Sequence, residues 1–204
     1  AAGMAVWKQR WPRARCSMGG HSLGGQLAPL FAGLHPGTFD SLLLVASGSP
    51  YWRQFRHRWL IGLGLLLAPS LARLRGHLPG RRLGFAGNEA RGVVADWARS
   101  GRTGNYAAKG LNTDLERVLA SVCLPRLALR LRDDWLGPAA SLAWLLDKLG
   151  PAPCTQQVLA PSDLAGCPAD HFSWMKSPEP VAARIADWLD ALDGAPAAGA
   201  GPVA

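Results

Sequence analysis

The sequence predicts an α/β fold in which a parallel sheet is covered on both faces by helices. Two short, nearly continuous apolar runs, residues 39–46 and 125–131, are typical of strands buried on both faces of a parallel sheet. Segments with helical periodicity lie before and after these runs, so strand and helix alternate along the chain. With 204 residues, of which 49% are hydrophobic, the chain can form one domain with a substantial core.

The first predicted helix covers residues 26–34, where apolar side chains recur at helical spacing despite Pro29. The residues 35–37 (His-Pro-Gly) end this helix, and the strand at 39–46 follows. A strand should also lead into the helix from its N-terminal side. Residues 13–20 are a poor candidate, because they lack the apolar run that a central buried strand requires.

Residues 51–122 show no strand-like alternation and predict several helices. We expect these helices to be broken at Pro69, at Pro79-Gly80 and between Gly101 and Gly104. This helical insert leaves the sheet after one strand and returns before the next. A cap over an active site would occupy such a position.

Strand character returns at 125–131, and a helix that opens with a proline follows at 138–149. Residues 154–159 predict a last strand, and residues 180–192 predict an amphipathic closing helix. The tail at 194–204 is of low complexity, and we expect it to be disordered.

These elements divide the chain into four parts. We expect an N-terminal part of the core at residues 1–50, a helical cap at 51–122, a C-terminal part of the core at 123–193 and the tail at 194–204. The most apolar stretch, residues 59–71, lies in the cap. It is shorter than a membrane-spanning helix and contains a proline, so it does not predict one.

The chain is strongly basic, with 22 Lys and Arg against 14 Asp and Glu and a formal net charge of +8. Arginines concentrate near the start of the chain and between Arg53 and Arg102, beside Trp52, Trp59 and the apolar stretch. Neither zinc-finger spacing nor an aromatic RNA-binding signature accompanies them, so the sequence predicts no nucleic-acid partner. The pattern suits peripheral contact with an anionic membrane surface, and a solvated basic face is the alternative.

The cysteines form no C-x-x-C pair, and no histidine stands at zinc-finger spacing from them. They are Cys16, Cys123, Cys154 and Cys167. We therefore expect reduced thiols, no metal site and no cofactor.

Residues 1–16 contain no apolar stretch long enough for the core of a signal peptide, so we expect a cytoplasmic protein.

Residues 20–24, Gly-His-Ser-Leu-Gly, match the pattern G-x-S-x-G of a nucleophile elbow. In such an elbow the serine, here Ser22, sits in a strained turn between a strand and a helix. We expect that a Cβ at Gly20 or Gly24 would clash with the neighbouring backbone. A glycine-rich turn with an idle serine is the alternative, because the bare pattern also arises by chance.

A serine hydroxyl needs a general base within hydrogen-bond reach, and the base needs a carboxylate to orient it. With a nucleophile elbow, the order along the chain is serine, then acid, then histidine. Asp133-Asp134 follows the strand at 125–131, and His171 follows the strand at 154–159. The chain therefore supplies the three residue types in the required order.

Each of these residues has an alternative role. Asp133 and Asp134 are both candidates for the acid, and they could instead form a turn and a helix cap. His171 could be an ordinary loop histidine. The other histidines fit the role of base less well. They lie in the elbow (His21), at a helix end (His35) and in the basic insert (His57 and His77). Asp163 and Asp170 are weaker candidates for the acid of the site because they follow the last strand.

The chain resembles the α/β hydrolases, and more narrowly a bacterial group of predicted α/β hydrolases akin to serine aminopeptidase and monoacylglycerol lipase-like enzymes. The stretches that carry the resemblance are GHSLGGQL (20–27), VASGSPYWR (45–53), LPGRRLG (78–84), DWARSGR (96–102), RLRDDWLGP (130–138) and DHFSWM (170–175). The resemblance implies an α/β-hydrolase fold with a helical cap insert. It also implies Ser22 as nucleophile, Asp134 as acid, His171 as base and the backbone N–H of Leu23 as one oxyanion-hole donor.

The chain departs from this family at its start, because a complete hydrolase carries several strands before the elbow and Ser22 stands close to residue 1 here. We therefore expect the N-terminal strands to be lacking, together with the loop that normally donates the second oxyanion-hole N–H. The sequence then predicts a serine hydrolase that cleaves carboxylic ester or amide bonds of apolar small molecules through an acyl-enzyme. The alternative is a catalytically inactive hydrolase-like fragment that acts as a binding or interaction module.

Overall fold

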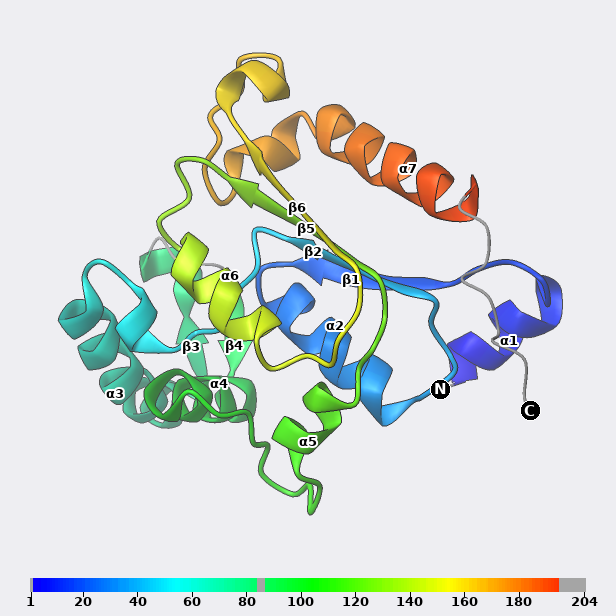
Figure 1. Cartoon of the computed structure of the whole chain (residues 1–204). Coiled ribbons are helices and arrows are strands. Elements are labelled where there is room, and N and C mark those ends of the chain that lie inside the picture. The colour runs from blue at the N-terminus through cyan, green and yellow to red at the C-terminus, as the bar shows by residue number, and fades with distance from the viewer. Residues whose placement is uncertain (1, 84–86, 195–204) are drawn as a thin grey trace.

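The computed structural model describes residues 2–83 and 87–194 of the chain. Within them, a four-stranded sheet has the strand order β1-β2-β5-β6 (Figure 1). Its strands are β1 (Ser17–His21), β2 (Ser41–Val45), β5 (Arg126–Leu131) and β6 (Cys154–Leu159). All neighbouring pairs are parallel, with Gly20 opposite Leu44 and Leu44 opposite Ala128. The parallel sheet that the sequence predicted is confirmed, and the carboxyl ends of its strands meet at one edge.

Helices cover both faces of this sheet, as Figure 1 shows. On one side lie α2 (Leu23–Leu34), α5 (Leu115–Ala120) and α6 (Ala139–Leu146), and on the other lies α7 (Glu179–Gly194). Leu127 and Leu129 of β5 pack in one cluster with Val181 of α7. Ala128, between them, packs with Leu145 of α6. Because successive strand side chains point to opposite faces, the continuous apolar run of β5 supplies both layers of the core.

The strand β1 forms although its sequence lacks an apolar run, so the expectation of a poor strand here was wrong. A Cβ at Gly19 would lie 2.5 Å from the Cβ of Leu43, so glycine allows β1 to approach β2 closely. The Oγ atoms of Ser17 and Ser41 also lie 2.7 Å apart. The side chains of β1 are half-buried or exposed, so the strand needs no continuous apolar run. A helix that we did not predict, α1 (Ala2–Arg10), precedes it.

The insert between β2 and β5 contains two long helices and a small hairpin. The helices are α3 (Arg58–Arg75) and α4 (Arg91–Thr103), and β3 (His77–Pro79) pairs with β4 (Asn88–Ala90) in antiparallel fashion. Short 3-10 helices lie at Trp52–Gln54 and Gly80–Leu83. The hairpin corrects our expectation that the insert holds no strand. Leu78 of β3 is buried with Ala72 of α3 and Val94 of α4, so packing between elements, rather than local alternation, supports it.

The helix α3 continues through Pro69, where we expected a break. A proline inside a helix leaves the carbonyl four residues earlier without its intrahelical N–H donor. That carbonyl belongs to Leu65, and it accepts a hydrogen bond of 2.8 Å from Nη1 of Arg102 on α4. The neighbouring helix thus supplies the donor that the proline lacks. The helix α4 ends at Thr103, within the range Gly101 to Gly104 where we expected a break, and Gly104 with a φ of 80° forms its C-cap.

The helix α5 lies in the range that we assigned to the cap but packs with the core. Its residues Leu115 and Leu119 are buried in one cluster with Leu30 of α2. We therefore use the name cap for residues 52–103, from the first 3-10 helix to the end of α4.

The elements predicted after the insert are all present, namely β5, α6, β6 and α7. The tail expected to be disordered, beyond α7, lies outside the described residues. Among residues 2–83 and 87–194, none of the helices has both the length and the apolar composition that crossing a membrane requires.

Candidate active site

Ser22 lies in the sharp turn between β1 and α2, at the carboxyl edge of the sheet. Its φ of 54° and ψ of −118° fall outside the regions that residues other than glycine normally adopt. Neighbouring groups hold this conformation. The N–H of Ser22 donates to the carbonyl of Val45 at 3.0 Å, and the N–H of Gly25 donates to the carbonyl of Ser22 at 3.1 Å. The hydroxyl of Ser47 donates to the same carbonyl, so the strained turn is fixed from both sides.

Two glycines make room for this turn, and one of them is not the residue that we expected. A Cβ at Gly20 would lie 2.9 Å from the Cα of Gly24, so position 20 requires glycine as predicted. A Cβ at Gly24 would meet nothing within 4 Å, so the clash expected there was wrong. The second close approach occurs at Gly25, where a Cβ would lie 2.1 Å from the Oγ of Ser47. The first turn of α2 can approach the end of β2 because of Gly25.

Three side chains from separate loops meet at this turn. The Oγ of Ser22 lies 2.8 Å from Nε2 of His171, and Nδ1 of His171 lies 2.8 Å from Oδ2 of Asp134. His171 and Asp134 are 6% and 4% exposed, so the link between them is shielded from water. A carboxylate that accepts the Nδ1–H leaves Nε2 free to accept a proton from the serine. The structure brings together Ser22, His171 and Asp134. The order along the chain had left Asp133 and Asp134 both open, and the resemblance had implied Asp134.

The structure distinguishes the two neighbouring aspartates. The Oδ1 of Asp134 accepts hydrogen bonds from the N–H groups of Leu136 and Gly137, at 2.8 and 2.9 Å. These bonds leave Oδ2 to face the histidine. The carboxylate of Asp133 instead pairs with Arg132 at 3.2 Å, and both of these side chains are more than half exposed. Asp134 is therefore the carboxylate that faces Nδ1 of His171.

Asp170 holds the loop that carries His171, although we had considered it only as a weaker candidate for the acid of the site. Its Oδ1 accepts hydrogen bonds from the N–H groups of Phe172 and Ser173, at 2.9 and 2.8 Å. The hydroxyl of Ser173 donates to Oδ2, and this hydrogen bond is the main cause that lowers the pKa of Asp170 below its usual value. An aspartate followed closely by a serine is typical of such side-chain turns, and this was the signal available in the sequence.

His21 contacts the backbone of His171, and we had set it aside as part of the elbow. Its Nε2 lies 2.8 Å from the carbonyl oxygen of His171, so Nε2 carries the proton and donates. The centroids of the two rings are 4.7 Å apart. Burial lowers the pKa of His21, and the neighbouring His171 lowers it further. A neutral His21 therefore serves as a positioning residue beneath the histidine of the site.

The other residues that we considered lie away from this arrangement. Asp163 pairs with Arg184 of α7 at 3.5 Å. His35 follows the end of α2, His57 precedes α3, and His77 begins β3. In the part of the chain that the structure describes, no three His, Cys, Asp or Glu side chains gather in a way that could hold a metal ion.

A pocket of about 130 Å³ opens beside Ser22 and His171, between the core and the cap. Its apolar lining residues from the cap are Phe55, Ile61, Leu78, Val93, Val94 and Trp97. None of its described lining residues precedes Ser22 in the chain.

Leu23 also lines the pocket and begins α2, and the first N–H groups of an α-helix have no intrahelical acceptor. The N–H of Leu23 is therefore the candidate oxyanion-hole donor on this side.

This arrangement of sheet and helices has counterparts among solved structures. Over 92% of its length, the chain aligns with 73% of the monoacylglycerol lipase of Paleococcus ferrophilus, with a TM-score of 0.53 and 14% sequence identity. The chain has the α/β-hydrolase fold. A structure described for the metagenome-derived lipolytic enzymes LipS and LipT also aligns with this hydrolase fold. The alignment covers 89% of this chain and 68% of that chain, with a TM-score of 0.52 and 16% sequence identity.

The hydrolase fold also aligns with haloalkane dehalogenase DbeA from Bradyrhizobium elkani, over 95% of this chain and 73% of that chain, with a TM-score of 0.50 and 16% identity. At such identities the similarity establishes the fold alone. No family model matches the sequence, and no curated protein matches it either.

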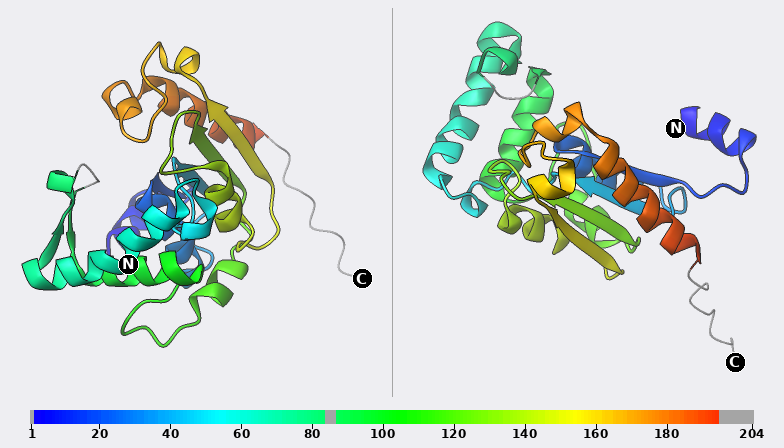
Figure 2. Two further views of the ribbon diagram at one scale, coloured as in Figure 1. Left: turned by 90° about the vertical axis from the view of Figure 1, so that its left-hand side faces the viewer. Right: turned by 90° about the horizontal axis from the view of Figure 1, so that it is seen from above.

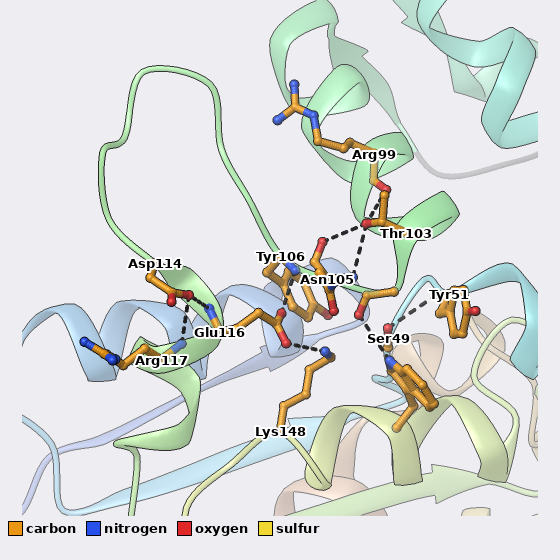
Figure 3. Close-up of polar contacts among 12 residues, drawn as sticks. Ser49, Tyr51, Arg99, Thr103, Asn105, Tyr106, Asp114, Glu116, Arg117 and Lys148 are labelled. Atoms are coloured by element: carbon orange, nitrogen blue, oxygen red, sulfur yellow. Dashed lines mark hydrogen bonds and ion pairs between the residues drawn. The ribbon is translucent and has the colours of Figure 1, made fainter.

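In this hydrolase fold the two ends of the cap are attached to the same core helix. Tyr51, just before the cap, packs against Trp144 of α6, with the ring centroids 4.8 Å apart and the ring planes tilted by 39°. The Nε1 of Trp144 donates to the carbonyl of Gly104, just after the cap, at 3.2 Å. Figure 3 shows the adjoining network, in which the carboxylate of Glu116 accepts a hydrogen bond from the N–H of Tyr106 at 2.6 Å. These contacts hold the cap over the end of the sheet where Ser22 lies.

Proposed function

We propose that this chain is a serine hydrolase that cleaves carboxylic ester bonds, or the related amide bonds, of apolar small molecules through an acyl-enzyme. The observation that carries the proposal is the hydrogen-bonded path from Ser22 through His171 to Asp134, with 2.8 Å at both links. A serine hydroxyl is a weak nucleophile at neutral pH, and such a path is the known physical means of activating it. The strained turn at Ser22 also supports the proposal, because strain of this kind gathers at functional sites.

The first half-reaction forms the acyl-enzyme. Nε2 of His171 accepts the hydroxyl proton of Ser22 while Oγ attacks the carbonyl carbon of the substrate. The carbonyl π electrons move to the oxygen, and the N–H of Leu23 donates a hydrogen bond to the resulting oxyanion. The intermediate then collapses, the bond to the alcohol breaks, and His171 returns the proton to the departing oxygen. Asp134 remains ionised throughout and stabilises the imidazolium.

The second half-reaction releases the acid. A water molecule gives its proton to Nε2 of His171 and attacks the acyl carbon, and the new oxyanion again faces the N–H of Leu23. Collapse breaks the bond to Oγ, and the proton returns to Ser22. The same three residues therefore act in both halves of the cycle.

The pocket beside Ser22 supports apolar substrates. Its cap-side wall consists mostly of aliphatic and aromatic side chains, with Glu89 as the exception. From the core, Gln26 and Ser49 line it together with Ser22 and His171. Transfer of apolar surface from water into such a pocket is favourable by about 25 cal/mol per Å². We infer that the acyl part of the substrate is apolar and that its carbonyl lies at the open end of the pocket beside Ser22.

Labelling with a fluorophosphonate probe tests the proposal. The probe forms a covalent bond with an activated serine, so we expect labelling of the unaltered chain and none of Ser22→Ala. Hydrolysis of a nitrophenyl ester by the same two proteins provides the second readout. Equal labelling of both proteins, or labelling of neither, would contradict the proposal.

A second candidate is a hydrolase-like module that binds apolar ligands without turnover. It is favoured by the absence, among the described lining residues, of any residue before Ser22 that could offer a second oxyanion-hole donor. Loss of one such donor lowers turnover by about 100-fold to 1,000-fold. This candidate predicts saturable binding of a fluorescent fatty acid, with neither probe labelling nor ester hydrolysis.

A further inference from the structure

The outer face of α3 carries a row of exposed apolar side chains. Exposed helix faces of water-soluble domains normally carry polar and charged residues, and the apolar stripe faces the core. In α3 the inward side chains include the buried Leu65 and Ala72, yet apolar side chains also cover the outside. Those exposed by half or more are Trp59, Leu60, Leu63, Leu66, Leu67 and Leu74. Figure 2 shows α3 at the outer edge of the molecule, on the side opposite the N-terminal helix.

Arginines flank this apolar row at both ends and have no acidic neighbours in the sequence. The segment 41–88 contains seven arginines and no Lys, Asp or Glu, so it holds +7 of the formal net charge of +8. All seven are exposed, at positions 53, 56, 58, 73, 75, 81 and 82. The ion pairs among the described residues involve none of them. The face therefore combines apolar contact area with an unneutralised positive charge.

A second copy of this chain is a poor partner for the face. A symmetric dimer formed through α3 would bring two segments of charge +7 together, and like charges repel across an interface. An acidic lipid surface offers both complements at once, because its headgroups attract arginine and its acyl chains accept leucine and tryptophan. The charge complementarity thus selects a membrane surface over self-association.

An apolar groove leads from this face toward the site. It has a volume of about 300 Å³ and is lined by residues of α3 that include Leu60, Leu67 and Leu71. Three of its lining residues also line the pocket beside Ser22, namely Ile61, Leu78 and Trp97. The apolar walls of the groove and of the pocket are therefore adjacent and share side chains.

We propose that the outer face of α3 docks on an anionic lipid surface. The helix lies in the plane of the interface, with its leucines and Trp59 among the upper acyl chains and the arginines at the phosphate level. No membrane-spanning segment is needed for this mode of binding. Docked in this way, the groove opens toward the lipid, so that an acyl-bearing substrate can reach the pocket without crossing water. This last step alone rests on the proposed hydrolase function.

Flotation with vesicles tests the docking. The unaltered chain is mixed with vesicles of equal parts phosphatidylglycerol and phosphatidylcholine, or of phosphatidylcholine alone, at low and high salt. We expect flotation with the anionic vesicles at low salt and much less in the other three conditions, because salt screens the attraction. Ser22→Ala should float as the unaltered chain does, so failure of the hydrolase proposal would leave this result intact.

Two variants on α3 and two matched controls locate the contact. Arg73→Gln with Arg75→Gln should weaken partition about 30-fold, since each basic residue near such a surface contributes about 1 kcal/mol. Arg10→Gln with Arg13→Gln removes the same charge from another exposed segment and should have little effect.

Leu63→Gln with Leu66→Gln should weaken partition at least about tenfold. Leu27→Gln with Leu111→Gln makes the same chemical change at exposed leucines elsewhere and should leave partition unchanged. Hydrogen exchange on the unaltered chain gives an independent readout, because the amides of α3 should become protected when anionic vesicles are added.

Several results would overturn the docking surface. These are equal flotation with neutral and anionic vesicles, flotation with neither, or controls that lose as much partition as the α3 variants. Unchanged exchange of α3 in the presence of bound vesicles would also overturn it. Sedimentation that shows a dimer, converted to a monomer by Leu63→Gln with Leu66→Gln, would assign the face to a second copy of the chain instead.

Discussion

At the scale of single residues, substitutions at His171, Asp134 and Asp133 distinguish the proposed base, the proposed acid and a neighbouring aspartate outside the site. In the proposed mechanism, His171 moves the proton in both half-reactions, whereas Asp134 only orients the imidazole of His171 and stabilises its positive charge. We expect His171→Ala to lower kcat for a nitrophenyl ester by about 10⁵-fold or more, and Asp134→Ala by about 10⁴-fold. Asp133→Ala is the matched control, since its carboxylate pairs with Arg132, and it should retain nearly full activity. A larger loss in Asp133→Ala than in Asp134→Ala would show that the wrong carboxylate was assigned.

We expect His21 to make the free energy of unfolding depend on pH. Its pKa is lowered in the folded state, chiefly by burial, from an ordinary value of about 6.5. Below pH 6.5 the unfolded chain therefore binds more protons at this position than the folded chain does. The stabilisation is complete above about pH 6.5 and is lost progressively as the pH falls below that value.

Urea unfolding at pH 7.5 and pH 5.5 measures this effect. We expect the free energy of unfolding of His21→Gln to depend less on pH than that of the unaltered chain, because glutamine does not titrate and its amide can still donate to the carbonyl of His171. His57→Gln is the control, since His57 is exposed at the start of α3, and it should keep the original dependence. Identical slopes for His21→Gln and the unaltered chain would exclude His21 as the source.

At the scale of elements, α3 and α4 are coupled through one hydrogen bond. Arg102 on α4 donates to the carbonyl of Leu65, which lacks an intrahelical donor because of Pro69. We expect Arg102→Ala to lower the free energy of unfolding by about 1–3 kcal/mol, the range for a carbonyl left without a partner. Pro69→Ala restores an N–H for the same carbonyl and should rescue part of that loss.

A double-mutant cycle in urea isolates the coupling. Pro69→Ala should stabilise the Arg102→Ala protein by about 1 kcal/mol more than it stabilises the unaltered chain, because only the former has an unpaired carbonyl at Leu65. The general gain in helix propensity from removing proline cancels in this comparison. Additive effects of the two substitutions would contradict the coupling.

At the scale of the whole molecule, the pocket exists only because the cap and the core meet over Ser22. Its walls combine residues of the first βα turn with residues of α3, β3 and α4. Burial of one methylene contributes about 0.8 kcal/mol, which corresponds to about a fourfold change in an equilibrium. A pocket shared by cap and core should therefore select substrates by acyl length.

A series of nitrophenyl esters from acetate to decanoate tests this selection. We expect kcat/KM of the unaltered chain to rise about two- to fourfold for each added methylene until the pocket is filled. Ile61→Ala, in the wall shared with the groove under α3, should flatten the rise and leave the acetate rate nearly unchanged. Leu111→Ala, at an exposed position outside the pocket, is the matched control. A flat series for the unaltered chain would leave the cap residues with a packing role alone.

Local patterns of the sequence were enough to predict much of this molecule. The apolar runs at 39–46 and 125–131 predicted β2 and β5, because a strand buried on both faces needs apolar side chains at every position. The order of elbow, aspartate pair and histidine predicted which loops would meet, because carboxyl ends of parallel strands share one edge of the sheet. These features depend on residues that are near one another in the chain, or on a rule of topology.

Contacts between distant segments decided the rest. The strand β1 forms because Gly19 lets its backbone approach Leu43, and the close approach in the elbow falls at Gly25 because Ser47 lies there. The helix α3 passes Pro69 because Arg102, on another helix, supplies the missing donor. The choice of Asp134 over Asp133 depends on which carboxylate faces His171 after the sheet has formed. Periodicity and propensity describe each segment alone, whereas a close approach or a hydrogen bond between segments exists only in the folded chain.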